Sequence, residues 1–144
     1  MSVLNEQVRS VVDERLPLVT NLANVSAILN TMEDLNWAGF YLVRDDVLYL
    51  GPFQGEVACT RIEKGRGVCG ASFLKKETII VDDVNKFPGH IACSSLSKSE
   101  IVVPIIKNDE VVAVIDIDSP IYNRFNKEIA RELEEIAVFL AKLF

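Results

Sequence analysis

The chain has 144 residues, of which 49% are hydrophobic and 25% are charged, the proportions of an ordinary globular protein. This length is typical of one domain with a buried core, so we expect a single domain over residues 1–144. The net charge of -6 argues against nucleic acid and anionic membranes as partners, because both attract clustered Lys and Arg. With no membrane-length apolar run and no signal-peptide core at the start, we expect a cytoplasmic protein.

Apolar residues at helical spacing predict three helices near the two ends of the chain. The first covers residues 1–16, because Pro17 interrupts the helical pattern, and the second covers residues 20–33. The third lies in the final segment, NKEIARELEEIAVFLAKLF, where Asn126 is a plausible N-cap.

Between these helices lie short apolar runs bounded by turn residues, which is the pattern of β-strands. The runs are WAGFYLV, DVLYLGPF, VACTRI, TIIVD, IVVPII and VVAVIDID. Helices that flank a mostly antiparallel sheet of about six strands form an α+β arrangement, and this is the fold class we predict. Cys59 falls inside the third run, whereas Cys69 and Cys93 fall outside the strands.

The cysteine count of three is odd, and the spacing of Cys59, Cys69 and Cys93 is irregular. A structural disulfide framework normally has an even count and belongs to a secreted protein. Zinc also fits poorly, because no CxxC pair is present and the chain has one histidine; we predict no metal site. Two interpretations stay open: unrelated thiols, some of them buried, or a redox set in which one cysteine attacks and another resolves.

The segment GRGVCGASFLKK predicts a tight glycine turn that opens into a short helix, with Cys69 near the helix N-terminus. Free backbone N–H groups and the helix dipole would stabilise a thiolate there and lower its pKa. A small buried residue in a glycine-rich turn explains the same pattern.

Cys93 lies in a run of some 15 residues between two predicted strands, which is long for a loop without a function. Small residues surround it, including Ser94 and Ser97, and suit the close approach of a ligand. His90 could stabilise a thiolate, although a lone histidine in such a loop is more often a local hydrogen-bonding residue.

Two carboxylates follow two valines along one face of the last strand, because side chains alternate. That face carries Val112, Val114, Asp116 and Asp118. A hairpin with IVVPII would bring Glu100 close to the two aspartates. A two-residue turn would place Glu100 on the opposite face, and an odd loop or a bulge would place it on the same face. The sequence leaves this register open.

Three clustered acids repel one another, so at least one could be protonated near neutral pH and donate a proton. In their ionised form they suit a small cationic ligand such as an α-ammonium group. Trp37 and Tyr41 share a strand face and could supply the apolar wall of such a pocket.

Five motifs in order resemble the free methionine-(R)-sulfoxide reductases, which are single GAF domains. They are NWAGFYL, GPFQGEVACTRIEKGRGVCG, FPGHIACSS, SEIVVPI and IDIDSP. The resemblance covers about residues 36–125. Single motifs of this kind are weak, whereas five in order with three cysteines at matching positions are specific.

The resemblance implies a role for each cysteine. Cys93 matches the catalytic cysteine, which attacks the sulfoxide and becomes a sulfenic acid. Cys69 matches the cysteine that resolves it to a disulfide, and Cys59 matches a further cysteine able to exchange into a disulfide; which of the two is the main resolver stays open. Ser94 stands where many members carry an acid.

The other implied roles concern substrate and partners. Glu100, Asp116 and Asp118 match acids that hold the substrate and assist protonation, and Trp37 and Tyr41 match the methyl-side pocket. The family implies no bound cofactor, reduction by thioredoxin with NADPH as the remote electron source, and a homodimer. The rival functions are a sensory GAF module that binds a cyclic nucleotide or tetrapyrrole, and a thiol sensor of peroxide.

Overall fold

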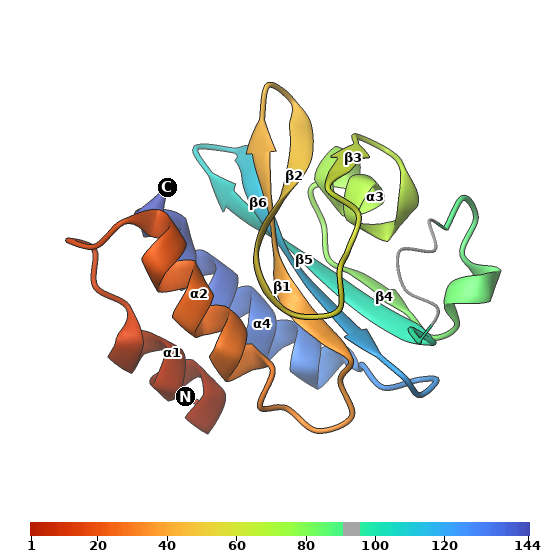
Figure 1. The fold of residues 1–144 in the computed structure, drawn as a ribbon, viewed down its shortest axis with the longest axis horizontal. Helices are drawn as coiled ribbons and strands as arrows, with labels where there is room; N and C mark the ends of the chain where they lie inside the picture. The colour runs from red at the N-terminus through yellow and green to blue at the C-terminus, as the bar shows by residue number, and fades with distance from the viewer. Residues whose placement is uncertain (91–95) are drawn as a thin grey trace.

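The computed structural model describes residues 1–90 and 96–144 and has the predicted α+β architecture. Its centre is a six-stranded sheet of order β3-β2-β1-β6-β5-β4, in which every neighbouring pair is antiparallel (Figure 1). The strands are β1 (Trp37–Arg44), β2 (Val47–Gly55), β3 (Arg61–Glu63), β4 (Ile79–Val81), β5 (Ser99–Lys107) and β6 (Glu110–Ser119).

Helices cover both faces of the sheet (Figure 1). One face carries α1 (Val3–Val11), α2 (Leu18–Leu29) and α4 (Lys127–Leu140), and the other carries α3 (Gly67–Lys75). Two short 3-10 helices, η1 (Val84–Lys86) and η2 (Ala141–Leu143), complete the described elements. None of the helices in the described part of the chain is long and apolar enough to cross a membrane.

Two hydrophobic cores lie on opposite sides of the sheet. The larger core packs the long helices against residues such as Phe40, Ile101 and Ile115. The smaller core packs α3 against Trp37, Tyr41, Val102 and Val114, among others. Because side chains alternate along a strand, β1, β5 and β6 contribute to both.

The two N-terminal helices begin or end at positions different from those predicted. The first ends at Val11 rather than at residue 16, because Val12 is extended and the Asn21 side chain bonds both the N–H and the carbonyl of Asp13. The Asn21 side-chain bonds to the backbone of Asp13 compete with continuation of the first helix. The second helix covers Leu18–Leu29 rather than 20–33.

The C-terminal helix agrees with the prediction. Asn126 is its N-cap, and the Asn126 side-chain oxygen accepts a hydrogen bond of 2.9 Å from the N–H of Ile129. The run VACTRI, in contrast, is a strand only at its end, because β3 begins at Arg61. Cys59 therefore lies in the connection before β3, and the prediction that it falls inside a strand is wrong.

The hairpin of β5 and β6 settles the register that the sequence left open. Its turn is the two residues Asn108 and Asp109, both at positive φ, as in a type I′ turn. A β-bulge lies between Ile105 and Ile106 and brings Glu100 directly opposite Asp118.

The same bulge corrects one expectation about the face of β6. An extra residue in one strand shifts the side-chain alternation locally. Val112 accordingly packs against the larger core, whereas Val114 and Asp116 face the smaller one, so Val112 does not share their face.

Candidate active site

A pocket opens beside the smaller core, where β1, β5 and β6 meet the start of α3. Its walls contain the predicted acids and aromatic residues together with one cysteine and the histidine. The lining includes Trp37, Tyr41, Arg66, Cys69, His90, Ser97, Glu100, Asp116 and Asp118. Residues more than 80 positions apart thus converge on one small volume.

Glu100, Asp116 and Asp118 meet because of the strand register. Glu100 lies opposite Asp118, and Asp116 lies opposite Val102, two residues along β5. Glu100 is 7% exposed and Asp116 is 6% exposed. Glu100 therefore lies close to the two aspartates, and the register that the sequence left open places all three acids around one pocket.

Burial sets the protonation of these acids. It raises the pKa of Glu100 well above its usual value, and the charges of Asp116 and Asp118 raise it further. Burial and the Asp116 charge likewise raise the pKa of Asp118. Burial also raises the pKa of Asp116, but hydrogen bonds with Glu100 and Cys69 oppose that shift. Asp116 is therefore the most easily ionised of the three carboxyl groups, and the protonated side chains of Glu100 and Cys69 donate hydrogen bonds to it.

The Oδ1 atoms of Asp116 and Asp118 have no hydrogen-bond partner among the described residues. A buried carboxyl oxygen without a partner destabilises the fold. The two oxygens therefore mark where a ligand with N–H donors or a positive charge would be stabilised.

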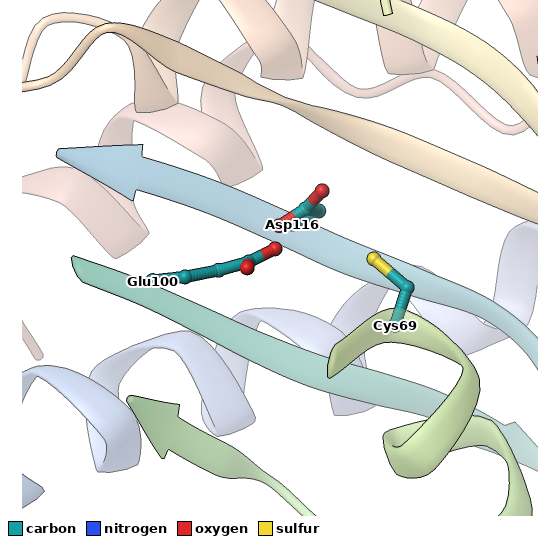
Figure 2. A group of neighbouring side chains, drawn as sticks. All are labelled: Cys69, Glu100 and Asp116. Carbon is teal, nitrogen blue, oxygen red and sulfur yellow. The ribbon is translucent and has the colours of Figure 1, made fainter. Parts of the chain in front are cut away.

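Cys69 lies in the first turn of α3, as predicted, and is a free buried thiol with 4% of its surface exposed. Figure 2 shows its sulfur directed toward the Glu100 and Asp116 carboxyls. Burial raises the pKa of this thiol, and the charges of Asp116 and Glu100 raise it further. Of the two interpretations that the sequence left open, a buried residue in a glycine-rich turn agrees with this raised pKa, and a thiolate stabilised by the helix N-terminus does not.

Trp37 and Tyr41 form the aromatic wall. Their rings stack with centroids 6.0 Å apart. Trp37 also stacks on Phe53 at 5.0 Å, a β2 residue that the sequence did not single out although it faces β1 at Gly39. Burial raises the pKa of Tyr41, so its hydroxyl keeps its proton.

Both aromatic residues also hold the segment that precedes β3. The Tyr41 hydroxyl donates a hydrogen bond of 2.8 Å to the carbonyl of Cys59. The Trp37 indole N–H donates a hydrogen bond of 3.1 Å to the carbonyl of Glu56. Cys59 itself is disulfide-bonded in this structure. Hydrogen bonds thereby link the aromatic wall of the pocket to the backbone of the segment that carries Cys59.

Cys93 and Ser94 lie outside the described residues, and the attacking role of Cys93 stays a prediction. His90 lines the pocket, and burial lowers its pKa although the Asp116 charge opposes the shift. The imidazole is therefore predominantly neutral at pH 7.

Arg66 and Ser97 line the pocket without having been assigned a specific role from the sequence. Arg66 is the N-cap residue of α3, and Ser97 Oγ accepts a hydrogen bond of 3.1 Å from Asn36. Only the glycine-rich turn around Arg66 signalled a helix start in the sequence.

A metal ion could be held by Cys69, Glu100 and Asp116, whose ligand atoms all lie within 4.8 Å of one another.

The family model described as "GAF domain" matches residues 25–143 of the chain. The chain is 43% identical to the Escherichia coli free methionine-R-sulfoxide reductase, over 97% of this chain and 86% of that protein. It is 48% identical to the Saccharomyces cerevisiae free methionine-R-sulfoxide reductase, over 90% of this chain and 77% of that protein.

A solved structure is equally similar. The Neisseria meningitidis free methionine-R-sulfoxide reductase in complex with its substrate superposes with a TM-score of 0.92 at 47% identity, covering 99% of this chain and 86% of that one. Because fold and sequence agree over nearly the whole chain, it belongs to the free methionine-R-sulfoxide reductase family of GAF-domain proteins.

Proposed function

We propose that this chain reduces free methionine-(R)-sulfoxide to methionine, with the oxidised cysteine restored by thioredoxin. The observation that carries the proposal is the acid cluster beside an aromatic wall, in which two carboxyl oxygens have no hydrogen-bond partner among the residues that the structure describes. A free amino acid brings an ammonium group with three N–H donors, and these oxygens suit it. The Neisseria relative, named for the same reaction, was solved with its substrate bound.

Each end of the substrate has a matching group in the pocket. Asp116 would receive the ammonium group, with Asp118 beside it. The carboxylate would lie near Arg66 and the free N–H groups at the start of α3, since a helix N-terminus attracts anions. The S-methyl group would contact the Trp37 and Tyr41 rings. A pocket that holds the ligand at three points can distinguish the R from the S configuration at the sulfoxide sulfur.

The chemical step we propose uses Cys93 as the nucleophile. Its thiolate attacks the sulfoxide sulfur while an acid protonates the oxygen; the oxygen is then transferred to the Cys93 sulfur and methionine leaves. The net change is thiol plus sulfoxide giving sulfenic acid plus thioether, a transfer of two electrons. Glu100 supports the proton-donor role, because its raised pKa keeps a proton available near neutral pH.

Resolution is the step where the structure modifies our expectation. The resemblance gave the resolving role to Cys69, but Cys69 is a buried thiol whose pKa is raised, which disfavours the attacking thiolate. Cys59 is disulfide-bonded and follows Val57, which is 90% exposed. We therefore propose that Cys59 attacks the sulfenic acid and releases water.

Thioredoxin would then reduce the Cys59–Cys93 disulfide and be oxidised in turn, with NADPH supplying its electrons through thioredoxin reductase. The exposed neighbourhood of Cys59 supports access by a protein reductant. A reducing cytoplasm suits this cycle. The homodimer implied by the resemblance has no assigned part in it and stays a prediction.

The test supplies thioredoxin, thioredoxin reductase and NADPH, and follows NADPH oxidation with free methionine-(R)-sulfoxide and with the S epimer. We expect turnover of the R epimer alone, and none by Cys93→Ser. Equal turnover of the two epimers, or undiminished activity in Cys93→Ser, would refute the proposal. NADPH oxidation without any added sulfoxide, but with peroxide, would favour a peroxide sensor instead.

A further inference from the structure

The buried group of Cys69, Glu100 and Asp116 has the composition of a metal site, although the cysteine spacing argued against one. The three side chains come from α3, β5 and β6 and are directed toward one another (Figure 2). One ligand atom from each, the Cys69 sulfur and one oxygen from each carboxyl, lies within 4.8 Å of the others. Sequence spacing could not reveal this set, because it spans three separate elements.

The Oδ1 atom of Asp116 is an independent indication of a ligand. Asp116 is 6% exposed, lines the pocket, and has no partner for this oxygen among the described residues. The Asp118 Oδ1 atom also has no partner among the described residues. Unpartnered oxygens beside a thiol offer several ligand atoms in one place, and a divalent cation that displaces the protons of Cys69 and Glu100 would satisfy them together.

The donor set selects the kind of cation. Mg²⁺ and Ca²⁺ prefer all-oxygen sites, whereas a thiolate favours borderline metals such as Zn²⁺. Zinc bonds of about 2.3 Å to sulfur and about 2.0–2.2 Å to oxygen place tetrahedral ligands roughly 3.5 Å apart. The present separations of up to 4.8 Å would close by about 1 Å, within the reach of side-chain rotation. Three protein ligands leave a position for water or for His90, which lines the same pocket.

We infer that Cys69, Glu100 and Asp116 form a Zn²⁺ site that overlaps the substrate position and blocks it when occupied. Binding replaces the Cys69 S–H bond by an S–Zn bond and the Glu100 O–H bond by an O–Zn bond, and releases both protons to solvent, with no change in oxidation state. Asp116 cannot hold the metal and the substrate ammonium group at the same time. Binding of zinc and of substrate is therefore mutually exclusive, a consequence that rests on the proposed function.

The test uses the Cys59→Ser/Cys93→Ser double variant, in which Cys69 is the one remaining cysteine. Co²⁺ is the probe, because a cobalt–thiolate bond gives an intense near-ultraviolet absorption. We expect this band to saturate at one Co²⁺ per chain and to disappear when Zn²⁺ is added. Absence of the band would overturn the inference, and this readout needs no turnover, so it is independent of the reductase proposal.

Two further variants in the same background examine the carboxyl ligand. Asp116→Asn should weaken Co²⁺ binding at least tenfold, whereas Asp109→Asn, in the exposed hairpin turn, should leave it unchanged. Equal affinities in the two variants would overturn the inference. Circular dichroism of both variants checks that they are folded.

Overlap with the substrate position is examined with free methionine-(R)-sulfoxide, which the double variant cannot reduce. At ten times its own Kd, the sulfoxide should raise the apparent Kd for Zn²⁺ about tenfold. An unchanged Kd for Zn²⁺, with the cobalt band present, would refute the overlap while leaving the metal site standing.

Discussion

Glu100 and Asp118 lie directly opposite each other on the antiparallel strands β5 and β6. Two acids at such a position repel each other and destabilise the sheet. Both are largely shielded from water, and the pKa of each is raised mainly by burial. The arrangement is therefore retained at a cost in stability, as expected where binding requires it.

Glu100→Gln should stabilise the protein at pH 8. The folded pKa of Glu100 lies well above its ordinary value of 4.5, so the native state holds a proton that the unfolded state releases. The stability from that proton is present below the unfolded pKa and is lost as pH rises through the folded pKa. We expect the variant to gain at least about 1.4 kcal/mol in the free energy of unfolding at pH 8, and less toward pH 5.

Urea unfolding of the reduced proteins at pH 5, 6.5 and 8 measures this difference. Glu14→Gln, at an exposed position, is the matched control and should show no pH-dependent gain. A Glu100→Gln protein no more stable than wild type at pH 8 would contradict the assignment of a raised pKa. The same variant should lose most of its turnover of the sulfoxide, because Gln cannot donate the proton that Glu100 would supply.

Cys59→Ser should impair thioredoxin-linked turnover more than Cys69→Ser does. Cys59 is disulfide-bonded, whereas Cys69 is a free buried thiol directed toward the acids. Without Cys59, the sulfenic acid would form and then persist. We expect a normal first release of methionine and at least a tenfold lower steady-state rate.

Single-turnover release of methionine and trapping of sulfenic acid with dimedone measure the two steps separately. Cys69→Ser is the comparison, and it should accumulate little sulfenic acid. The opposite order of the two variants would return the resolving role to Cys69, as the sequence resemblance first implied.

The sequence predicted the fold and the composition of the pocket because both depend on periodicity. Alternation along WAGFYLV placed Trp37 and Tyr41 on one face, and helical spacing located α4. The register of Glu100 was not predictable, because it depends on a bulge near Ile105 that carries no marker in the sequence. Likewise, the early end of α1 depends on Asn21, a residue of the next helix.

The pKa values and hydrogen bonds of the site residues were less predictable than the identity of those residues. The pKa of Cys69 depends on burial and on acids that follow 31 to 49 residues later in the sequence, so local reasoning from the helix dipole gave the wrong direction. The hydrogen bond from Tyr41 to the Cys59 carbonyl is equally non-local. Such relationships require coordinates, since no spacing rule encodes them.

Tyr41→Phe should slow formation of the disulfide without slowing reduction of the sulfoxide. The Tyr41 hydroxyl donates a hydrogen bond of 2.8 Å to the Cys59 carbonyl, whereas the proposed contact with the S-methyl group involves the ring, which lines the pocket. Loss of one such hydrogen bond, about 1 kcal/mol, corresponds to about a fivefold slower step. Rapid-quench measurement of methionine and of free thiols separates the two rates.

Tyr49→Phe, at a 38% exposed position on β2, is the matched control and should alter neither rate. Equal slowing of both steps in Tyr41→Phe would show that the hydroxyl acts on the substrate pocket and not on the Cys59 segment.

Gly55→Ala should damage the pocket more than Gly89→Ala does. Both glycines have positive φ, so both substitutions carry backbone strain of about 1–3 kcal/mol. They differ in what the new methyl group meets. At Gly55 it would lie 2.5 Å from the Trp37 ring, whereas at Gly89 no atom of the described residues lies within 4 Å.

The Trp37 ring would have to move in Gly55→Ala, and it stacks on both Tyr41 and Phe53. We expect an additional loss of about 1–3 kcal/mol in stability from this crowding, together with a KM for the sulfoxide raised at least fivefold. Gly89→Ala should lose only the stability that corresponds to the backbone strain, with no change in KM. Trp37 fluorescence, from the one tryptophan of the chain, reports the displacement directly. An emission spectrum and a KM unchanged from wild type in Gly55→Ala would show that the ring is not held against Gly55, and that the aromatic wall is not positioned by this close approach.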